Sequence, residues 1–183
     1  GGIGTFVKAS YESHADVGDR TNDAIRMDGN EMQCRVIGEG GNLGLTQLGR
    51  IEYALHGGTI YTDFIDNSAG VDCSDHEVNI KILLNDIVLN GDMTEKQRNE
   101  LLAAMTDDVS ALVLRNNYWQ TQALGIAAKY STEKADALQH FIQSFEANGN
   151  LDREIEFLPD DKTLQERKSQ GSGLTKPELS VLL

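Results

Sequence analysis

The chain has 183 residues and a net charge of −13, with 39% hydrophobic and 25% charged residues. This composition is ordinary for a folded globular protein, and the length suits one domain or one and a half. The acidic balance argues against a sequence-independent nucleic-acid binder and against docking on an anionic membrane, because both need clustered Lys and Arg. No apolar run approaches the roughly 18 residues of a membrane helix, and no signal peptide is present. The sequence therefore predicts a cytoplasmic protein.

The two cysteines, Cys34 and Cys73, are too few for a disulfide-stapled secreted domain, and neither belongs to a C-x-x-C pair. We expect two partly buried thiols in a reducing cytoplasm. Both ends of the sequence look cut. It opens on glycines without a Met, and the Thr175–Glu178 capping box announces a helix shortly before the last residue. We therefore expect an internal piece of a larger protein.

The first half alternates between strand-like and helix-like segments. The glycine-rich residues 1–10 predict a turn and a short extended segment. The run from Cys34 to Ile37 predicts a short buried strand, and a second strand is predicted from Ile60 to Ile65. Between them, apolar residues from Leu43 to His56 recur at helical spacing, with Thr46 as a candidate cap and a glycine pair as the stop.

A polar turn follows each of these two strands. The first is Gly38-Glu39-Gly40-Gly41-Asn42 and the second is Asp66-Asn67-Ser68-Ala69-Gly70. In α/β nucleotide-binding units, ligands lie beyond the carboxyl ends of the strands, where both turns would fall. Glycines let a backbone approach a ligand closely, but the first turn fits a tight structural turn equally well, and it is not a G-x-G-x-x-G fingerprint.

The rest of the chain reads as helices. Residues 75–90 are apolar on much of the helical circumference, which predicts a well-buried helix. Thr94–Gln97 is another capping box, and helical spacing continues from Leu101 towards Tyr130. Ser131 is predicted to cap the next helix, and Pro159-Asp160-Asp161 to begin a short one.

These patterns predict an α/β fold, with a partial Rossmann-like parallel sheet of two to three short strands followed by a mainly α-helical subdomain. We assign residues 1–92 to the C-terminal part of a dinucleotide-binding domain. Residues 93–183 form the helical C-terminal subdomain.

A metal site is the alternative for the acidic stretch that contains Asp72, Asp75, His76 and Glu77. Neighbouring residues on a helix point in different directions, and acids in a first turn are explained by the helix dipole. A metal-dependent hydrolase is therefore the weaker interpretation. No Ser/His/Asp triad is legible among the scattered histidines.

The large bacterial NAD-specific glutamate dehydrogenases resemble this chain in three segments: GGIGTFVKAS…HADVGDRTNDAIR, VIGEGGNLGLTQLGRIEYALHGG and DFIDNSAGVDCSDHEVNIKILL. The segments LVLRNNYWQTQALG and LDREIEFLPDD…GLTKPELSVLL are similar to the same proteins, so the resemblance covers essentially the whole chain. It implies oxidative deamination of L-glutamate to 2-oxoglutarate and ammonia, with NAD as the cofactor.

The smaller hexameric glutamate dehydrogenases offer a comparison by residue. Their E-G-A-N turn resembles Glu39 to Asn42, which implies cofactor binding by Gly40, Gly41 and Asn42, with Asn42 beside the nicotinamide ribose. Their N-A-G-G-V-x-x-S loop resembles the segment from Asn67 to Ser74.

By this likeness Asn67 lies at the nicotinamide end, beside both cofactor and substrate. Val71 packs on the methylenes of glutamate, and Ser74 donates a hydrogen bond to its γ-carboxylate. The sequence departs from the family patterns at Gly41, at Ser68-Ala69 and at Asp72-Cys73, so the substrate contacts rest on a looser match than the fold.

In these families the catalytic lysine, the catalytic acid and the glycine fingerprint for the pyrophosphate come from segments before residue 1. Lys8 does not match the catalytic position, so we assign no catalytic residue and expect the isolated chain to be inactive. The expected partners are the remainder of the polypeptide and, at full length, further copies in a homo-oligomer. The alternative function is a non-catalytic helical assembly or regulatory module of a larger protein.

Overall fold

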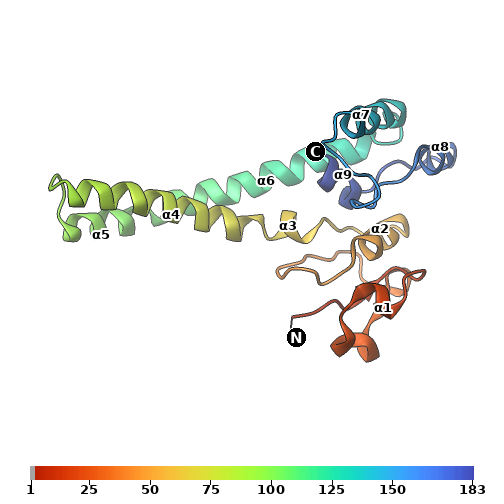
Figure 1. The fold of residues 1–183 in the computed structure, drawn as a ribbon, viewed down its shortest axis with the longest axis horizontal. Helices are drawn as coiled ribbons and strands as arrows, with labels where there is room; N and C mark the ends of the chain where they lie inside the picture. Colours follow the sequence, from red (N-terminus) through yellow and green to blue (C-terminus); the bar gives the residue numbers. More distant parts are fainter. Residues whose placement is uncertain (1–2) are drawn as a thin grey trace. The chain divides into compact units, whose positions relative to one another are not determined.

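The computed structural model describes residues 3–183, which are mostly helical with one small parallel sheet (Figure 1). The elements are, in chain order, β1 (Val7–Lys8), α1 (His14–Val17), the 3₁₀ helix η1 (Arg20–Ile25), β2 (Met27–Asp28), the 3₁₀ helix η2 (Gly29–Glu31), α2 (Gln47–Leu55), α3 (Asp63–Asp66), α4 (Ser68–Leu89), α5 (Glu95–Ala104), α6 (Thr106–Tyr130), α7 (Ala135–Ala147), α8 (Asp161–Ser169) and α9 (Lys176–Leu182). The α/β class is therefore consistent with the structure, in a form dominated by helix.

The chain divides into two compact units. The first contains residues 1–66 and 121–183, and the second contains residues 67–120. Residue 92, the predicted domain boundary, lies within the second unit, and the division at that residue stays a prediction.

The sheet pairs β1 with β2 in parallel, and a parallel bridge joins Val7 to Leu45. The strand predicted from Cys34 to Ile37 is reduced to a single parallel bridge between Val36 and Thr59. Backbone hydrogen bonds from Ile37 to Thr59 and from Thr59 to Arg35 close this bridge. The segments on either side of α2 are thus parallel, as in a βαβ crossover, but they are too short to form a ladder.

The second predicted strand, from Ile60 to Ile65, is wrong. Residues 63–65 begin the short helix α3, and the polar turn predicted over residues 66–70 is also wrong, because α4 begins at Ser68. The physical reason is local. The amides of Ile65 and Asp66 both donate to the Thr62 carbonyl. These hydrogen bonds close a helical turn, so the backbone after Thr62 is not extended as a strand requires.

Helix α2 forms where its spacing predicts. The Thr46 hydroxyl accepts a hydrogen bond from the amide of Gly49, and Gly57 follows the helix with a φ of 91°. A Cβ on Gly49 would lie 2.9 Å from the Lys8 carbonyl carbon, so glycine at this position lets α2 lie directly against β1.

The first unit contains two apolar clusters. The smaller packs α2 against the sheet and contains Val7, Leu45, Tyr53 and Ile60. The larger joins the later helices and contains Leu124, Ile142, Leu158, Leu164, Leu174, Leu179 and Leu182. A buried ion pair between Arg167 of α8 and Glu178 of α9, at 2.8 Å, accompanies this second cluster.

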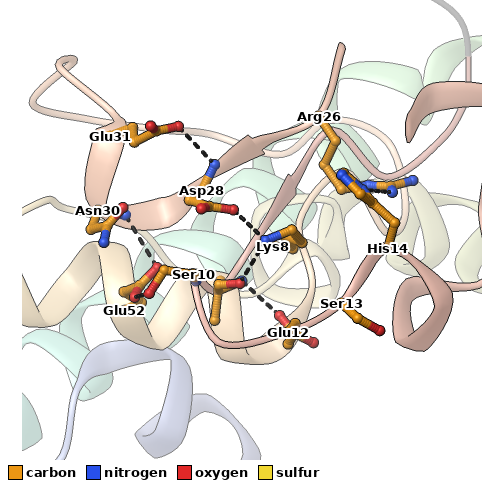
Figure 2. A network of polar contacts seen from close by, with 12 residues as sticks. Lys8, Ser10, Glu12, Ser13, His14, Arg26, Asp28, Asn30, Glu31 and Glu52 are labelled. Carbon is orange, nitrogen blue, oxygen red and sulfur yellow. Dashed lines mark hydrogen bonds and ion pairs between the residues drawn. The ribbon is translucent and has the colours of Figure 1, made fainter. Parts of the chain in front are cut away.

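Polar side chains connect β1, β2 and α2 beside the smaller cluster (Figure 2). Lys8 is buried and pairs with Asp28 on the neighbouring strand. Glu52 of α2 accepts hydrogen bonds from the amides of Ser10 and Asn30, at 2.9 and 3.2 Å. Because buried charges are costly unless paired, this network fixes how α2 sits on the strands.

In the second unit α5 lies beside α4, and α6 begins directly after α5 (Figure 1). The Asn116 side chain of α6 donates to Asp72 of α4 at 2.8 Å, and Asn117 donates to Ser68 at 3.0 Å. The prediction of a well-buried helix over residues 75–90 is wrong for this chain. The helix forms, but Leu84 is its single buried residue, because α5 and α6 cover only part of its surface.

Several local predictions in the remaining helices are confirmed. The capping boxes at Thr94 and Thr175 are present, and the short helix predicted at Pro159-Asp160-Asp161 begins at Asp161 with Asp160 as its cap. Ser131, however, is not the N-cap residue of α7. It is buried and its hydroxyl donates to the carbonyl of Leu174, while α7 begins after Lys134. Cys34 and Cys73 are free and exposed, so their predicted partial burial is wrong. Within residues 3–183, no helix is long and apolar enough to cross a membrane.

Candidate functional site

The glycine turn over residues 38–44 connects the bridge at Val36 to α2. Gly40, Gly41 and Asn42 are exposed on it. Neither glycine has a positive φ, and a Cβ added to either would meet nothing within 4 Å. Local conformation and packing therefore do not require glycine at these two positions. Open space above the backbone leaves room for a ligand to approach the peptide groups closely.

The carboxylates of Glu39, Asp63 and Asp66 each accept a hydrogen bond from a backbone N–H in the turn or directly after it. Together with Arg50 we call these residues the cage. Glu39 accepts from the amide of Leu45 at 2.9 Å, and Asp63 accepts from Leu43 at 2.8 Å. Asp66 accepts from the amide of Glu39 at 2.9 Å. The backbone on both sides of Asn42 is thereby fixed by carboxylates, those of Asp63 and Asp66 from outside the turn and that of Glu39 from within it.

Arg50 of α2 balances the charge of this cage. Its Nε donates to Glu39 at 2.8 Å, and its Nη2 lies 2.7 Å from Glu39 and 3.3 Å from Asp63. Nη2 makes no aligned hydrogen bond, so its attraction to the two carboxylates is ionic. Burial raises the pKa of Glu39, and Arg50 opposes that rise. One guanidinium therefore keeps two nearly buried acids in place.

A cleft of about 350 Å³ lies beside the turn. Its wall is mainly apolar, with Glu39 and Asn42 as its polar residues. It is lined by Ile3, Gly4, Phe6, Val7, Met32, Ile37, Gly38, Glu39, Gly41, Asn42, Gly44 and Leu45. An apolar cleft with a few polar groups is the usual form of a small-molecule site.

The remaining predicted site residues lie on α4 in the other unit. Asn67 is its N-cap residue, and Val71 and Ser74 follow at spacings of four and three, which places the three on one helix face. The Asn67 side chain makes no capping hydrogen bond. Val71 is 64% exposed, and the exposed Ser74 donates its hydroxyl to the Gly70 carbonyl at 3.0 Å. These side chains are thus accessible to a ligand.

The structure brings together Gly40, Gly41 and Asn42 in one unit, and Asn67, Val71 and Ser74 in the other. The cage residues Arg50, Asp63 and Asp66 were not predicted. Their signal in the sequence is a basic residue on α2 and two acids three positions apart, one in the predicted strand and the other in the polar turn after it.

The other candidates have structural roles. Lys8 forms an ion pair with Asp28 and donates a hydrogen bond to the carbonyl of Ala9. His76 lies 3.1 Å from Asp72, one turn back on the same helix. Within residues 3–183, no three His, Cys, Asp or Glu side chains are grouped to hold a metal ion, so nothing there favours the hydrolase alternative.

Residues 1–127 match the family described as bacterial NAD-glutamate dehydrogenase, catalytic domain. This chain belongs to that family. All 183 residues align with the NAD-specific glutamate dehydrogenases of Pseudomonas aeruginosa, Halomonas elongata and Mycobacterium tuberculosis, at 62%, 60% and 49% identity. The chain spans 11% of the length of each of these relatives. The family resemblance inferred from the sequence is therefore confirmed, and the chain corresponds to a small part of the whole dehydrogenase.

Proposed function

We propose that this chain contributes cofactor-binding and substrate-binding residues to the active site of an NAD-dependent glutamate dehydrogenase. The reaction converts L-glutamate, NAD⁺ and water into 2-oxoglutarate, ammonium, NADH and a proton. The observation that carries the proposal is the glycine turn, whose exposed backbone is fixed by buried carboxylates beside a mainly apolar cleft. Such a preorganised turn suits a ligand that must be held at one position for hydride transfer.

The residues proposed to bind the cofactor are those of the turn. Gly40 and Gly41 allow the cofactor to approach the backbone, and Asn42 directs its amide to the nicotinamide ribose. Residues 1–92 are then the C-terminal part of a Rossmann-like domain, and the parallel pairing of residues 36 and 59 around α2 supports this proposal. Backbone and amide groups bind the anionic cofactor without net positive charge, in keeping with the net charge of −13.

The residues proposed to bind the substrate lie on the exposed face of α4. Asn67 contacts both cofactor and substrate, Val71 packs on the methylenes of glutamate, and Ser74 turns its hydroxyl from the Gly70 carbonyl to the γ-carboxylate. These groups bind and orient the substrate and the cofactor. NAD, when bound, accepts the hydride. The buried ion pair of Lys8 leaves it unsuited to activate water, so the lysine and the acid of the reaction come from other parts of the full-length protein.

The test is glutamate-dependent NADH formation by a full-length protein that contains these residues and by the 183-residue chain alone. We expect turnover by the full-length protein and none above background by the chain, because the chain supplies no acid–base group. Turnover by the isolated chain at a comparable rate would contradict the assignment of the catalytic groups. An inactive but folded full-length protein would contradict the proposed function.

A second function, helical assembly, is favoured by the surface of α4. Val78, Ile82 and Leu89 continue the face that begins at Val71, and they are 54%, 62% and 84% exposed. Exposed large apolar side chains that recur along one helix face mark an interaction surface. We propose that the remainder of the same polypeptide covers it at full length. Homo-oligomeric assembly and a cytoplasmic location stay predictions.

Substitution of Ile82 by glutamate in the full-length protein tests this second function. A charge on the covered face is expected to lower the yield of correctly assembled protein several-fold, because a buried charge without a partner is costly. The matched control is Asn79→Glu, which adds the same charge to the same helix off that face. Size-exclusion profiles that are the same for both variants would contradict coverage of this face.

A further inference from the structure

Leu43, the residue after Asn42, has a left-handed backbone with a φ of 60°. Leu43 and Phe157 are the two residues other than glycine with a positive φ in residues 3–183. A leucine does not favour this conformation, because its Cβ approaches the backbone too closely. The Leu43 side chain is 65% exposed, so packing of the side chain does not impose the conformation.

Two side chains hold the peptide groups of Leu43, one at its N–H and the other at its carbonyl. The carboxylate of Asp63 accepts from the Leu43 amide at 2.8 Å, and the Thr5 hydroxyl donates to the Leu43 carbonyl at 2.7 Å. These partners are 20 and 38 residues away in sequence, and both are buried. The strained conformation is thus imposed by tertiary contacts and not by the local sequence.

The two partners are themselves anchored. Asp63 lies 3.3 Å from Arg50 through its other oxygen, which also accepts from the amide of Phe64 at 3.0 Å. The Thr5 amide donates to Asp19 at 2.9 Å. Strained backbone persists where the surroundings over-determine it, and it concentrates at ligand clamps.

We propose that Thr5 and Asp63 are positioning residues for cofactor binding, and that they act by holding Leu43 in the left-handed conformation that aims Asn42 at the cofactor. This inference rests on the proposed function. Neither residue needs to touch the cofactor. A purely stabilising role would lower the melting temperature without a specific change in the KM for NAD.

The experiment uses the full-length enzyme with Thr5→Val and Asp63→Ala. Thr5→Val keeps the shape and removes only the hydroxyl, so it stays informative where Asp63→Ala fails to fold. We expect a rise of about fivefold to tenfold in the KM for NAD, as for loss of one hydrogen bond, with kcat and the KM for glutamate little changed.

A rescue separates positioning from general stability. Glycine adopts a positive φ without strain, so Leu43→Gly in the Thr5→Val background should restore most of the affinity for NAD. The matched control is Phe157→Gly, which relieves the same kind of strain away from the turn. It should leave the KM for NAD at the level of Thr5→Val.

Asn42→Ala, measured in parallel, distinguishes failure of this inference from failure of the proposed site. If Asn42→Ala raises the KM for NAD while Thr5→Val and Asp63→Ala lower only the melting temperature, the positioning role is wrong and the site stands. An unchanged KM for NAD in Asn42→Ala overturns both. Equal rescue by Phe157→Gly also overturns the positioning role.

Discussion

Replacement of Arg50 by methionine is expected to destabilise the first unit of the 183-residue chain by about 3–5 kcal/mol, because it leaves buried carboxylates without their counter-ion. Arg50 lies 2.7 Å from Glu39 and 3.3 Å from Asp63, and its side chain is 5% exposed. Urea unfolding followed by circular dichroism measures the loss. Faster amide hydrogen exchange at Leu45, whose N–H donates to Glu39, places the loss in the turn.

The loss of stability caused by Arg50→Met should depend on pH. Burial already raises the pKa of Glu39 above its ordinary value of 4.5, and Arg50 opposes this rise. A carboxyl group with a raised folded-state pKa binds more protons in the folded than in the unfolded protein above that ordinary value. Its stability contribution therefore falls as the pH rises from the unfolded pKa through the folded one. Arg50→Met raises the folded pKa further, so its deficit should be smaller near pH 4.5 than near pH 7.

Two further variants serve as controls for Arg50→Met. Arg50→Lys keeps the charge but not the forked geometry, and it should lose less stability. Adding Glu39→Gln to Arg50→Met removes one of the unpaired charges and should recover part of the loss, as a double-mutant cycle measures. Independent, additive effects of the two substitutions would show that the ion pair does not hold the turn.

Asn67→Ala in the full-length enzyme is expected to lower kcat/KM for hydride transfer by about 100-fold, because misplaced reactants lose most of the advantage of orientation. Asn67 ends the segment that leads into α4, and its side chain makes no capping bond that the substitution would break. Assembly should therefore be intact by size-exclusion chromatography. Wild-type turnover in this variant would show that Asn67 is not part of the active site.

Ser74→Ala is the companion substitution on the same helix face. We expect a rise of about tenfold in the KM for glutamate and no change in the KM for NAD. Ser110→Ala is the matched control, since both serines are exposed and donate to the carbonyl four residues earlier, at 3.0 and 2.9 Å. Equal effects of the two substitutions would indicate a change in helix stability and not a substrate contact.

The sequence by itself determined the helices whose ends are set locally. Thr46, Thr94, Asp160 and Thr175 each accept a hydrogen bond from an amide three residues ahead. Such a cap needs no distant partner, so it can be read from a few residues. The glycine turn and the family resemblance are legible for the same reason, because they depend on short runs of residues.

Tertiary structure decided what depends on partners far along the chain. Ser131 resembles a helix cap in the sequence, but its hydroxyl donates to the carbonyl of Leu174, 43 residues away. The sequence of α4 predicts a buried helix, but α4 has neighbours on only part of its surface. The left-handed Leu43 is the clearest case. No local pattern predicts it, because the contacts that impose it come from Thr5 and Asp63, and the fold alone brings these two side chains to the turn.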